Sequence, residues 1–483
     1  MPGWMIRMAR IATLETPRRP GAVLAIIVVS NLMIVIDVSI AITGLPKMRE
    51  SLDISAAHLS WVHNAYALAF GGLLLLGARA GDIFGRRRMF IVGLALFTLA
   101  SLVIGLAPSA AWLLAARAVQ GAGAAVLAPS TLALLSTNFA PGPARTRALS
   151  YYTSAIGVGA TAGLVLGGLF ADLVSWRAGF FINLPIGVAL LVAARRYLAE
   201  TPKAAGTLDV VGAFSSTLGM GSLVYGIVRT AEAGWSDTIT VASLAAAAIL
   251  ITGFVINETR ASQPILPLRL LMNRQRSGAY VARMLFLGGM AGFWFFTTQF
   301  LQGVLGYRPL TAGLAFLPAT VFNFAAALMV PRLTRRLGNA RLVFLGLVLG
   351  VLGLAWLGQA GQDASYWTAV ALPMVLIGVA QGFVLAPLTA AAVADVTLED
   401  VGAASGLVNV AHQLGASLGL AVLVLVFAAA EPAGLVGPAA LAYRVDAAIG
   451  GGALMLLAAL GVSLATLHQR AAACVQAVPS AES

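Results

Sequence analysis

Residues 61–88 read WVHNAYALAFGGLLLLGARAGDIFGRRR, an apolar segment that runs into a short charged one. From Trp61 to Gly77 the segment is almost uncharged, and it is long enough for a helix to cross a bilayer. Gly85 permits a sharp turn, Asp82 can cap the next helix or pair with an arginine, and the basic run marks a cytoplasmic membrane flank. Two interpretations stay open, a stop-transfer flank and a hinge that holds one conformation. The second assigns the hinge to Arg79, Asp82, Gly85, Arg86, Arg87 and Arg88.

The composition of the whole chain is that of a membrane protein. Of its 483 residues, 60% are hydrophobic and only 10% are charged, with a mean hydropathy of +0.92. Soluble domains carry about 25% charged residues, so lipid must be the solvent of this chain. The net charge of +12 could suggest nucleic acid. The basic residues instead lie in short clusters between apolar runs, which favours the lipid bilayer as the partner.

Several kinds of chemistry are excluded by what the sequence lacks. The single cysteine, Cys474, cannot form a disulfide or a thiolate metal site within one chain. The four histidines have no metal-ligand spacing. Neither lysine, Lys47 nor Lys203, follows a glycine, so there is no phosphate-binding loop for ATP. We therefore expect no metal, no cofactor, no catalytic residues and no enzyme activity.

Apolar runs of membrane-spanning length recur along the chain and predict an all-α protein of about fourteen transmembrane helices. The first run is too long for a signal-peptide core, so we expect it to be retained. The expected spans are 22–45, 61–78, 89–107, 110–135, 149–171, 179–194, 210–228, 238–256, 278–301, 312–330, 342–360, 367–389, 406–428 and 447–467.

The distribution of positive charge predicts the orientation. Of the 30 Lys and Arg residues, 22 fall on the side of the N-terminus, 6 on the other side and 2 within spans. The positive-inside rule then places both termini in the cytoplasm of a multi-pass cell-membrane protein. Abundant alanine, glycine and arginine with scarce lysine indicate a bacterial source.

An internal repeat divides the chain into two halves. Arg79-x-x-Asp82-x-x-Gly85-x-x-Arg88 matches a pattern over residues 332–341, Arg-x-x-Arg-x-x-Gly-x-x-Arg, and Leu-Ala-Pro recurs at 127–129 and 385–387. Duplicated halves suggest a site at their interface, opened alternately to either side. The expected regions are a cytoplasmic tail (1–20), an N-terminal six-helix half (21–200), two inserted helices (201–260), a C-terminal six-helix half (261–470) and a cytoplasmic tail (471–483).

Several of these segments resemble the major facilitator superfamily, and more narrowly its fourteen-span drug:proton antiporter family of the EmrB/QacA type. The resemblance covers nearly the whole chain. It rests on VIDVSIAITGLP at 35–46, GARAGDIFGRRR at 77–88, ARAVQGAGAAVLAPS at 116–130, SWRAGFFINLPIG at 175–187 and APLTAAAVADVTLEDVGAASGLVNVAHQLGASLG at 386–419. The span-4 motif supplies Arg117, Gln120, Gly121 and Gly123.

The resemblance implies a fold of two six-helix halves with two extra helices, and two positions depart from it. In the fifth span, Gly159, Gly163, Gly167 and Gly168 keep a small-residue face, but Leu164 stands where the family usually has proline. Before the thirteenth span, His412 stands where the family usually has arginine.

Asp37 is the first candidate for the chemistry, because it is the only acidic residue placed well inside a span. A carboxylate there costs roughly 2.5–3.5 kcal/mol unless it is paired, hydrated or protonated. A proton-coupled carrier needs such a group, whereas the structural alternative is an acid that holds a helix contact.

Arg117 is the second candidate, since its guanidinium cannot lose its charge and must face the bundle interior or a wet cavity. The resemblance gives it the role of coupling proton movement to helix rearrangement. We expect Arg283, near the start of its span, to extend its side chain to the interface.

A group of aromatic and amide side chains could line a substrate cavity, or the aromatic ones could anchor helices at the interface. The cavity candidates are Trp294, Phe295, Gln299, Gln302, Asn323 and His412. His63, at the outer end of its span, is expected to be solvated.

Together these features predict a monomeric, proton-coupled exporter of bulky amphipathic drugs or natural products. An uptake or export carrier for a specific metabolite is the nearest alternative, because fold does not fix the direction of transport. A non-transporting membrane scaffold or sensor is the alternative from another class.

Overall fold

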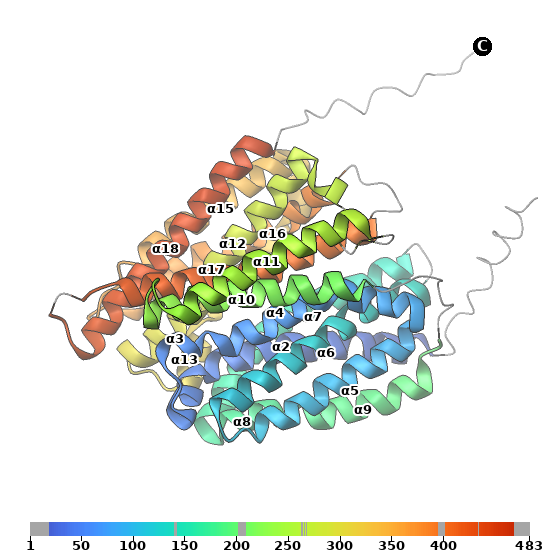
Figure 1. Ribbon diagram of the computed structural model, residues 1–483, viewed down its shortest axis with the longest axis horizontal. Coiled ribbons are helices and arrows are strands. Elements are labelled where there is room, and N and C mark those ends of the chain that lie inside the picture. The colour runs from blue at the N-terminus through green and yellow to red at the C-terminus, as the bar shows by residue number, and fades with distance from the viewer. Residues whose placement is uncertain are drawn as a thin grey trace, which may run out of the picture.

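The computed structural model describes residues 19–139, 143–200, 209–261, 264, 266, 268–394, 401–432 and 434–467. Within these ranges all regular structure is helical (Figure 1). Nearly all of the two predicted tails, Cys474 and Lys203 lie outside the described residues. A membrane requires this kind of fold, since a helix satisfies its own backbone hydrogen bonds.

Each expected span has a helical counterpart, and thirteen helices of the described chain are long and apolar enough to cross a membrane. A further long helix, α7, has a described apolar part at Gly159–Leu173. The first set of helices comprises α2 (Pro20–Leu52), α3 (Ala56–Leu59), α4 (Trp61–Phe84), α5 (Arg86–Gly105), α6 (Ala110–Asn138), α7 (Pro143–Leu173), α8 (Trp176–Phe181) and α9 (Asn183–Tyr197). The inserted helices are α10 (Val210–Ala233) and α11 (Thr238–Arg260).

The second set begins after a short 3₁₀ turn, η1 (Leu268–Leu271), and contains two π-helical turns, η2 and η3. Its elements are α12 (Arg274–Gln299), η2 (Phe300–Val304), α13 (Pro309–Ala315), α14 (Leu317–Leu337), α15 (Asn339–Leu357), η3 (Tyr366–Ala371), α16 (Leu372–Ala392), α17 (Val401–Ala429) and α18 (Gly437–Thr466). The last span differs most from expectation, because its helix begins at Gly437 rather than Ala447.

Helices pack most extensively within each set. In the first set α6 packs against α4 and α5, and α2 packs against α7. In the second set α12 packs against α17 and α18, and α16 packs against α14 and α15. Figure 1 shows the first set in blue to cyan and the second in yellow to red, with α10 and α11 between them.

The two sets meet where α4 packs against α17, and again at the end of the bundle that carries α3 and α13, which we call the α3 end (Figure 1, left). Here α7 packs against α13. A methyl group on Gly168 would lie 2.5 Å from the Pro309 carbonyl oxygen, and one on Gly313 would lie 2.5 Å from that of Leu164. The two backbones therefore touch directly, and only glycine permits this approach.

Polar contacts also join the two sets at the α3 end. Arg308 and Asp172 form an ion pair at 2.9 Å, and the Gln302 side chain donates to the Thr43 carbonyl oxygen at 3.1 Å. These contacts close the α3 end in this conformation.

The inserted helices α10 and α11 pack against each other, and α10 also packs against α4 and α17. At one end of the pair, Arg229 and Asp237 form an ion pair at 2.7 Å. Arg229, together with the backbone N–H of Thr240, lowers the pKa of Asp237 to about 2, so this carboxylate is ionised at neutral pH.

Two matching glycine turns stand at the opposite end of the bundle, which we call the Gly85 end. Gly85 joins α4 to α5 with φ 104°, and Gly338 joins α14 to α15 with φ 81°. Positive φ favours glycine at both positions. The two turns correspond to the repeated pattern of the sequence.

Candidate functional site

The Asp37 carboxylate lies at the centre of a buried polar network in the first set. It is completely buried on α2. Its Oδ2 accepts a hydrogen bond from Arg117 Nη1 at 2.8 Å. Its Oδ1 accepts from Gln120 Nε2 at 2.8 Å and from Asn183 Nδ2 at 2.7 Å. The network therefore joins α2 to α6 and α9.

Arg117 is equally enclosed, with 1% of its surface exposed. Its Nε donates to the Val62 carbonyl oxygen at 3.0 Å, and its Nη1 also donates to Gln120 Oε1 at 2.5 Å. The guanidinium carbon lies 4.4 Å from the centre of the Tyr66 ring, within the range of a cation–π contact. These contacts extend the network to α4.

All three side-chain groups around the Asp37 carboxylate are donors, which suits an ionised carboxylate that can only accept. A buried ion pair needs such extra hydrogen bonds to offset the loss of hydration. Protonation of Asp37 would remove the ion pair and leave the Arg117 charge without its counter-ion.

The sequence predicted both Asp37 and Arg117 but not their contact. It also missed Asn183 and Ser101, whose hydroxyl accepts from Gln120 Nε2 at 2.9 Å and from Asn183 Nδ2 at 3.2 Å. Both are polar residues inside apolar spans, and Asn183 lies in the FINLP part of a motif that the resemblance uses. A search for polar residues inside the apolar spans would therefore have identified Asn183 and Ser101.

The motif glycines lie at close helix contacts. Gly121 faces the Tyr66 carbonyl oxygen on α4, and Gly123 faces the Phe97 backbone on α5. On α7, the other glycines of the fifth-span motif face α2, whereas Gly168 faces α13. The glycines on the α2 side are Gly159, Gly163 and Gly167.

The predicted hinge residues surround the Gly85 turn. Asp82 and Arg86 form an ion pair at 3.0 Å. The Glu200 carboxylate accepts from the backbone N–H groups of Arg87 and Arg88, both at 3.1 Å, so it caps the start of α5. The Arg87 side chain donates to the Arg195 carbonyl oxygen at 2.6 Å. Arg79 lies half-buried on the last turns of α4.

The expectation that Arg283 extends to the interface is wrong. Its side chain is only 6% exposed, and it turns inward between α16 and α17. Nη1 donates to Thr389 Oγ1 at 2.9 Å and to the Leu385 carbonyl oxygen at 3.4 Å. Nη2 lies 3.2 Å from His412 Nδ1. The reason is that α12 begins at Arg274, which places Arg283 about two and a half turns inside the helix.

His63 also differs from expectation, because its Nε2 is buried and has no hydrogen-bond partner among the described residues. It follows Val62, whose carbonyl oxygen accepts from Arg117. The start of α4 is thus enclosed by the bundle rather than solvated.

The six candidate cavity residues have separate surroundings. Phe295 and Gln299 are buried in the helix packing, and Trp294 lies 5.0 Å from the Phe316 ring centre. Gln302 contacts Thr43 and His412 contacts Arg283, as described above. Asn323 is half-buried on α14.

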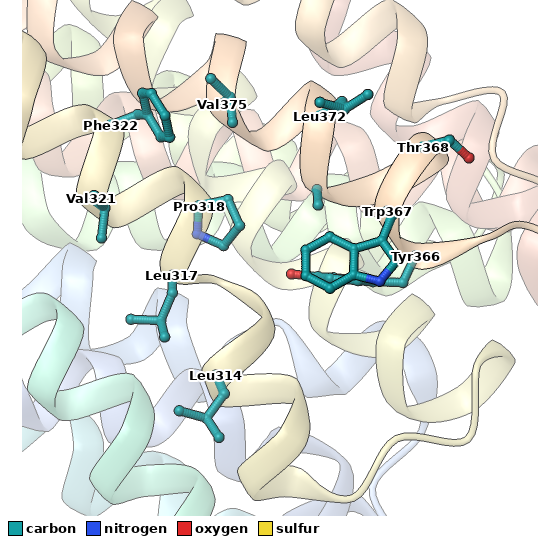
Figure 2. Close-up of a pocket in the computed structure, with 11 residues that line it drawn as sticks. Leu314, Leu317, Pro318, Val321, Phe322, Tyr366, Trp367, Thr368, Leu372 and Val375 are labelled. Atoms are coloured by element: carbon teal, nitrogen blue, oxygen red, sulfur yellow. The ribbon is translucent and has the colours of Figure 1, made fainter.

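A pocket of about 580 Å³ lies between α13–α14 and η3–α16. Figure 2 shows the residues that line it, such as Leu317, Phe322 and Trp367. Its lining is almost entirely apolar and includes exposed side chains such as Phe322 and Trp367. In a membrane-spanning chain, such exposed apolar side chains contact lipid. This cavity contains none of the six candidates.

Comparison with known proteins adds independent information. The model of the Major Facilitator Superfamily matches residues 27–420. The chain is 40% identical to the cephamycin export protein CmcT of Amycolatopsis lactamdurans, over 89% of each chain. It is 36% identical to the puromycin resistance protein pur8 of Streptomyces alboniger, over 92% of this chain and 89% of that one.

Solved structures agree on the fold. The POT family transporter PepTSo superposes with a TM-score of 0.69 at 14% identity, and the match covers 92% of this chain and 98% of that one. The resemblance drawn from the sequence motifs is confirmed, as is the expectation of a transporter rather than an enzyme. The chain belongs to the Major Facilitator Superfamily of membrane transporters.

Proposed function

We propose that this protein exports bulky amphipathic drugs or natural products in exchange for protons, with Asp37 as the proton-binding group. The observation that carries the proposal is the fully buried ion pair between Asp37 and Arg117. The names of the relatives, an antibiotic exporter and an antibiotic resistance protein, support efflux of this class of compound.

Asp37 suits proton coupling because its charge state determines which helices hold together. As a carboxylate it joins α2 to α6 and α9 through Arg117, Gln120 and Asn183. A proton on Asp37 removes the attraction to Arg117 and turns one oxygen from an acceptor into a donor that faces other donors. Protonation therefore favours a different packing of the three helices.

The closed α3 end supports one order of events for the proposed exchange. In this conformation Asp37 is completely buried, and α7 touches α13. Opening of the α3 end admits a proton to Asp37 as substrate leaves, and release of that proton on the opposite side restores the ion pair. The Gly85 turn, with Arg79, Asp82 and the basic run, controls closure of the other end.

The positive-inside rule assigns the α3 end to the outside and both termini to the cytoplasm of a bacterial cell membrane. With this orientation, one proton that enters releases about 2.3 kcal/mol per 100 mV of membrane potential. One chain contains the whole Asp37 network, so the monomer is the functional unit of the proposal.

The test uses everted membrane vesicles that contain the protein and a pH-sensitive dye. The vesicles are energised, and lipophilic cations, dyes and polyketide-like antibiotics are added in turn. We expect some of these compounds to cause proton efflux from the vesicles, and Asp37→Asn to reduce this flux to background. Asp363→Asn, which changes an exposed acid in a loop, is the matched control and keeps the flux.

Substrate-evoked proton flux that persists in folded Asp37→Asn would remove Asp37 from the proposal. Uptake of labelled substrate into the same everted vesicles establishes efflux from the cell. Movement in the opposite direction would favour the rival interpretation, an uptake carrier.

A further inference from the structure

Arg283 is a buried cation without a counter-ion in the described part of the chain. No carboxylate there forms an ion pair with it, and its contacts are a hydroxyl, a carbonyl oxygen and an imidazole nitrogen. A charge that is removed from water in this way needs compensation. Arg117, in contrast, has Asp37 at 2.8 Å.

One edge of the Arg283 guanidinium has fewer hydrogen-bond acceptors than it has donors among the described residues. Nη1 has two acceptors, Thr389 Oγ1 and the Leu385 carbonyl oxygen. Nε is buried and has no hydrogen-bond partner among the described residues. Nη2 has only His412 Nδ1. Nε and Nη2 form the edge of a guanidinium that binds both oxygens of a carboxylate.

His412 lies beside this edge and can take part in anion binding. Because a guanidinium only donates, His412 Nδ1 must be the acceptor, and the proton of the neutral ring is then on Nε2. The His412 ring is half-buried on α17, whereas Arg283 behind it is buried on α12. A ligand that binds both Nε and Nη2 of Arg283 would therefore displace the His412 ring from Nη2 and could accept a hydrogen bond from its Nε2–H.

We infer that Arg283 and His412 form an anion-binding subsite that recognises the carboxylate of an amphipathic organic acid, with Thr389 holding the guanidinium in place. This inference rests on the proposed export function and names a substrate class for it. The structural alternative is that Arg283 only ties α12 to α16 and α17.

The experiment compares two fluorescent probes of the same shape, pyrenebutyrate and its neutral amide, pyrenebutyramide. Binding to the purified full chain in lipid nanodiscs is measured by energy transfer from tryptophan to pyrene. We expect the acid to bind at least about tenfold more tightly than the amide, as one charge-assisted contact in a buried site allows.

Arg283→Gln should abolish this preference by weakening the acid and leaving the affinity for the amide unchanged. Arg283→Lys keeps the charge but not the two-pronged geometry, so we expect it to keep part of the preference. Arg336→Gln, which removes an exposed arginine on α14, is the matched control and keeps the full preference. A smaller loss is expected for Thr389→Val, through the position of the guanidinium.

Equal binding of the two probes by the natural chain, binding of neither, or a preference that persists in Arg283→Gln would overturn the inference. If Arg283→Gln does not accumulate as folded protein, the binding preference of Arg283→Lys tests the inference instead. A preference reduced several-fold in that variant supports the subsite, and an unchanged preference overturns it.

Proton flux in everted vesicles separates the inference from the proposed function. If the amide evokes as much proton flux as the acid, the carboxylate subsite is contradicted, whereas proton-coupled export is supported. Preferential binding of the acid through Arg283, without proton flux for any compound, would instead contradict the coupling to protons.

Discussion

Among the described residues, the first set of helices buries Arg117 and the second buries Arg276 and Arg283. Arg117 and Arg283 have different surroundings. Arg117 in the first set has a carboxylate at 2.8 Å and donates to a backbone carbonyl oxygen and a glutamine. Arg283 in the second set has only neutral partners in the described chain. Within the described residues, Arg117 therefore has a counter-ion and Arg283 has none.

The two glycine turns at the Gly85 end also differ in whether a carboxylate lies beside them. In the first set, the Glu200 carboxylate occupies the start of α5, beside Gly85. In the second set, no atom of the described residues lies within 4 Å of a methyl group built on Gly338. The comparison teaches that an internal repeat preserved the helices and the turn glycines, whereas the charges around them diverged. We associate the first set with proton coupling and the second with substrate recognition.

The largest expected difference is in stability. Arg117→Gln should destabilise the protein by about 3–5 kcal/mol, because it leaves Asp37 buried without its partner. Arg283→Gln loses hydrogen bonds worth roughly 1 kcal/mol each but also removes an unbalanced buried charge. We therefore expect a change within about 1–2 kcal/mol. Titration with SDS in mixed micelles, followed by tryptophan fluorescence, measures the stability of both variants. Equal losses of stability in the two variants would contradict the difference between the two arginines.

A double variant sharpens the same point. Asp37→Asn combined with Arg117→Gln removes both charges. Its loss of unfolding free energy should therefore be about 2–3 kcal/mol smaller than the sum of the two single losses. Proton flux should nevertheless stay at background, because no titratable group remains in the pair. Strict additivity of the stability changes would show that the ion pair contributes little.

Alanine substitution at the two turn glycines, Gly85 and Gly338, should give a smaller difference in stability. Alanine at either Gly85 or Gly338 is strained by the positive φ, at about 1–3 kcal/mol. At Gly85 the new methyl group would also lie 2.6 Å from a Glu200 carboxylate oxygen. We expect Gly85→Ala to lower the midpoint of SDS unfolding more than Gly338→Ala. The reverse order would contradict the role of Glu200 at this turn.

The smallest effect is expected for Glu200→Gln. The side chain remains able to accept hydrogen bonds, but the negative charge at the start of α5 is lost, which costs about 0.3–1 kcal/mol. Because the site is exposed, high salt should reduce the difference from the natural chain. A loss that is independent of salt would indicate a steric cause instead.

The sequence predicted the spans well because bilayer thickness sets the length of an apolar helix. It predicted Asp37 and Arg117 because a charge inside such a run is costly and therefore conspicuous. It could not predict their contact, since the orientation of helices that are apolar on all sides depends on packing between distant segments. Asn183 reaches Asp37 across 146 positions of sequence.

The error on Arg283 has a different origin. The apolar run was taken to begin at Gly278, but α12 begins at Arg274, with Asn273 accepting from the backbone N–H of Arg276 as a cap. A shift of one turn at a helix end moved a residue from the expected interface into the bundle. Trp294, Phe295 and Gln299 on α12 have different neighbours because residues on one helix point in several directions, and the substrate cavity stays a prediction.

The contact between α7 and α13 at the α3 end has a consequence for which substitutions the chain can tolerate. Gly168 and Gly313 place main chain against main chain, so the seal depends on the absence of side chains rather than on a matched pair of them. Mutations that reshape the binding region then leave the seal intact. The seal is therefore tolerant of change around it, and only the loss of one of its two glycines would part the helices.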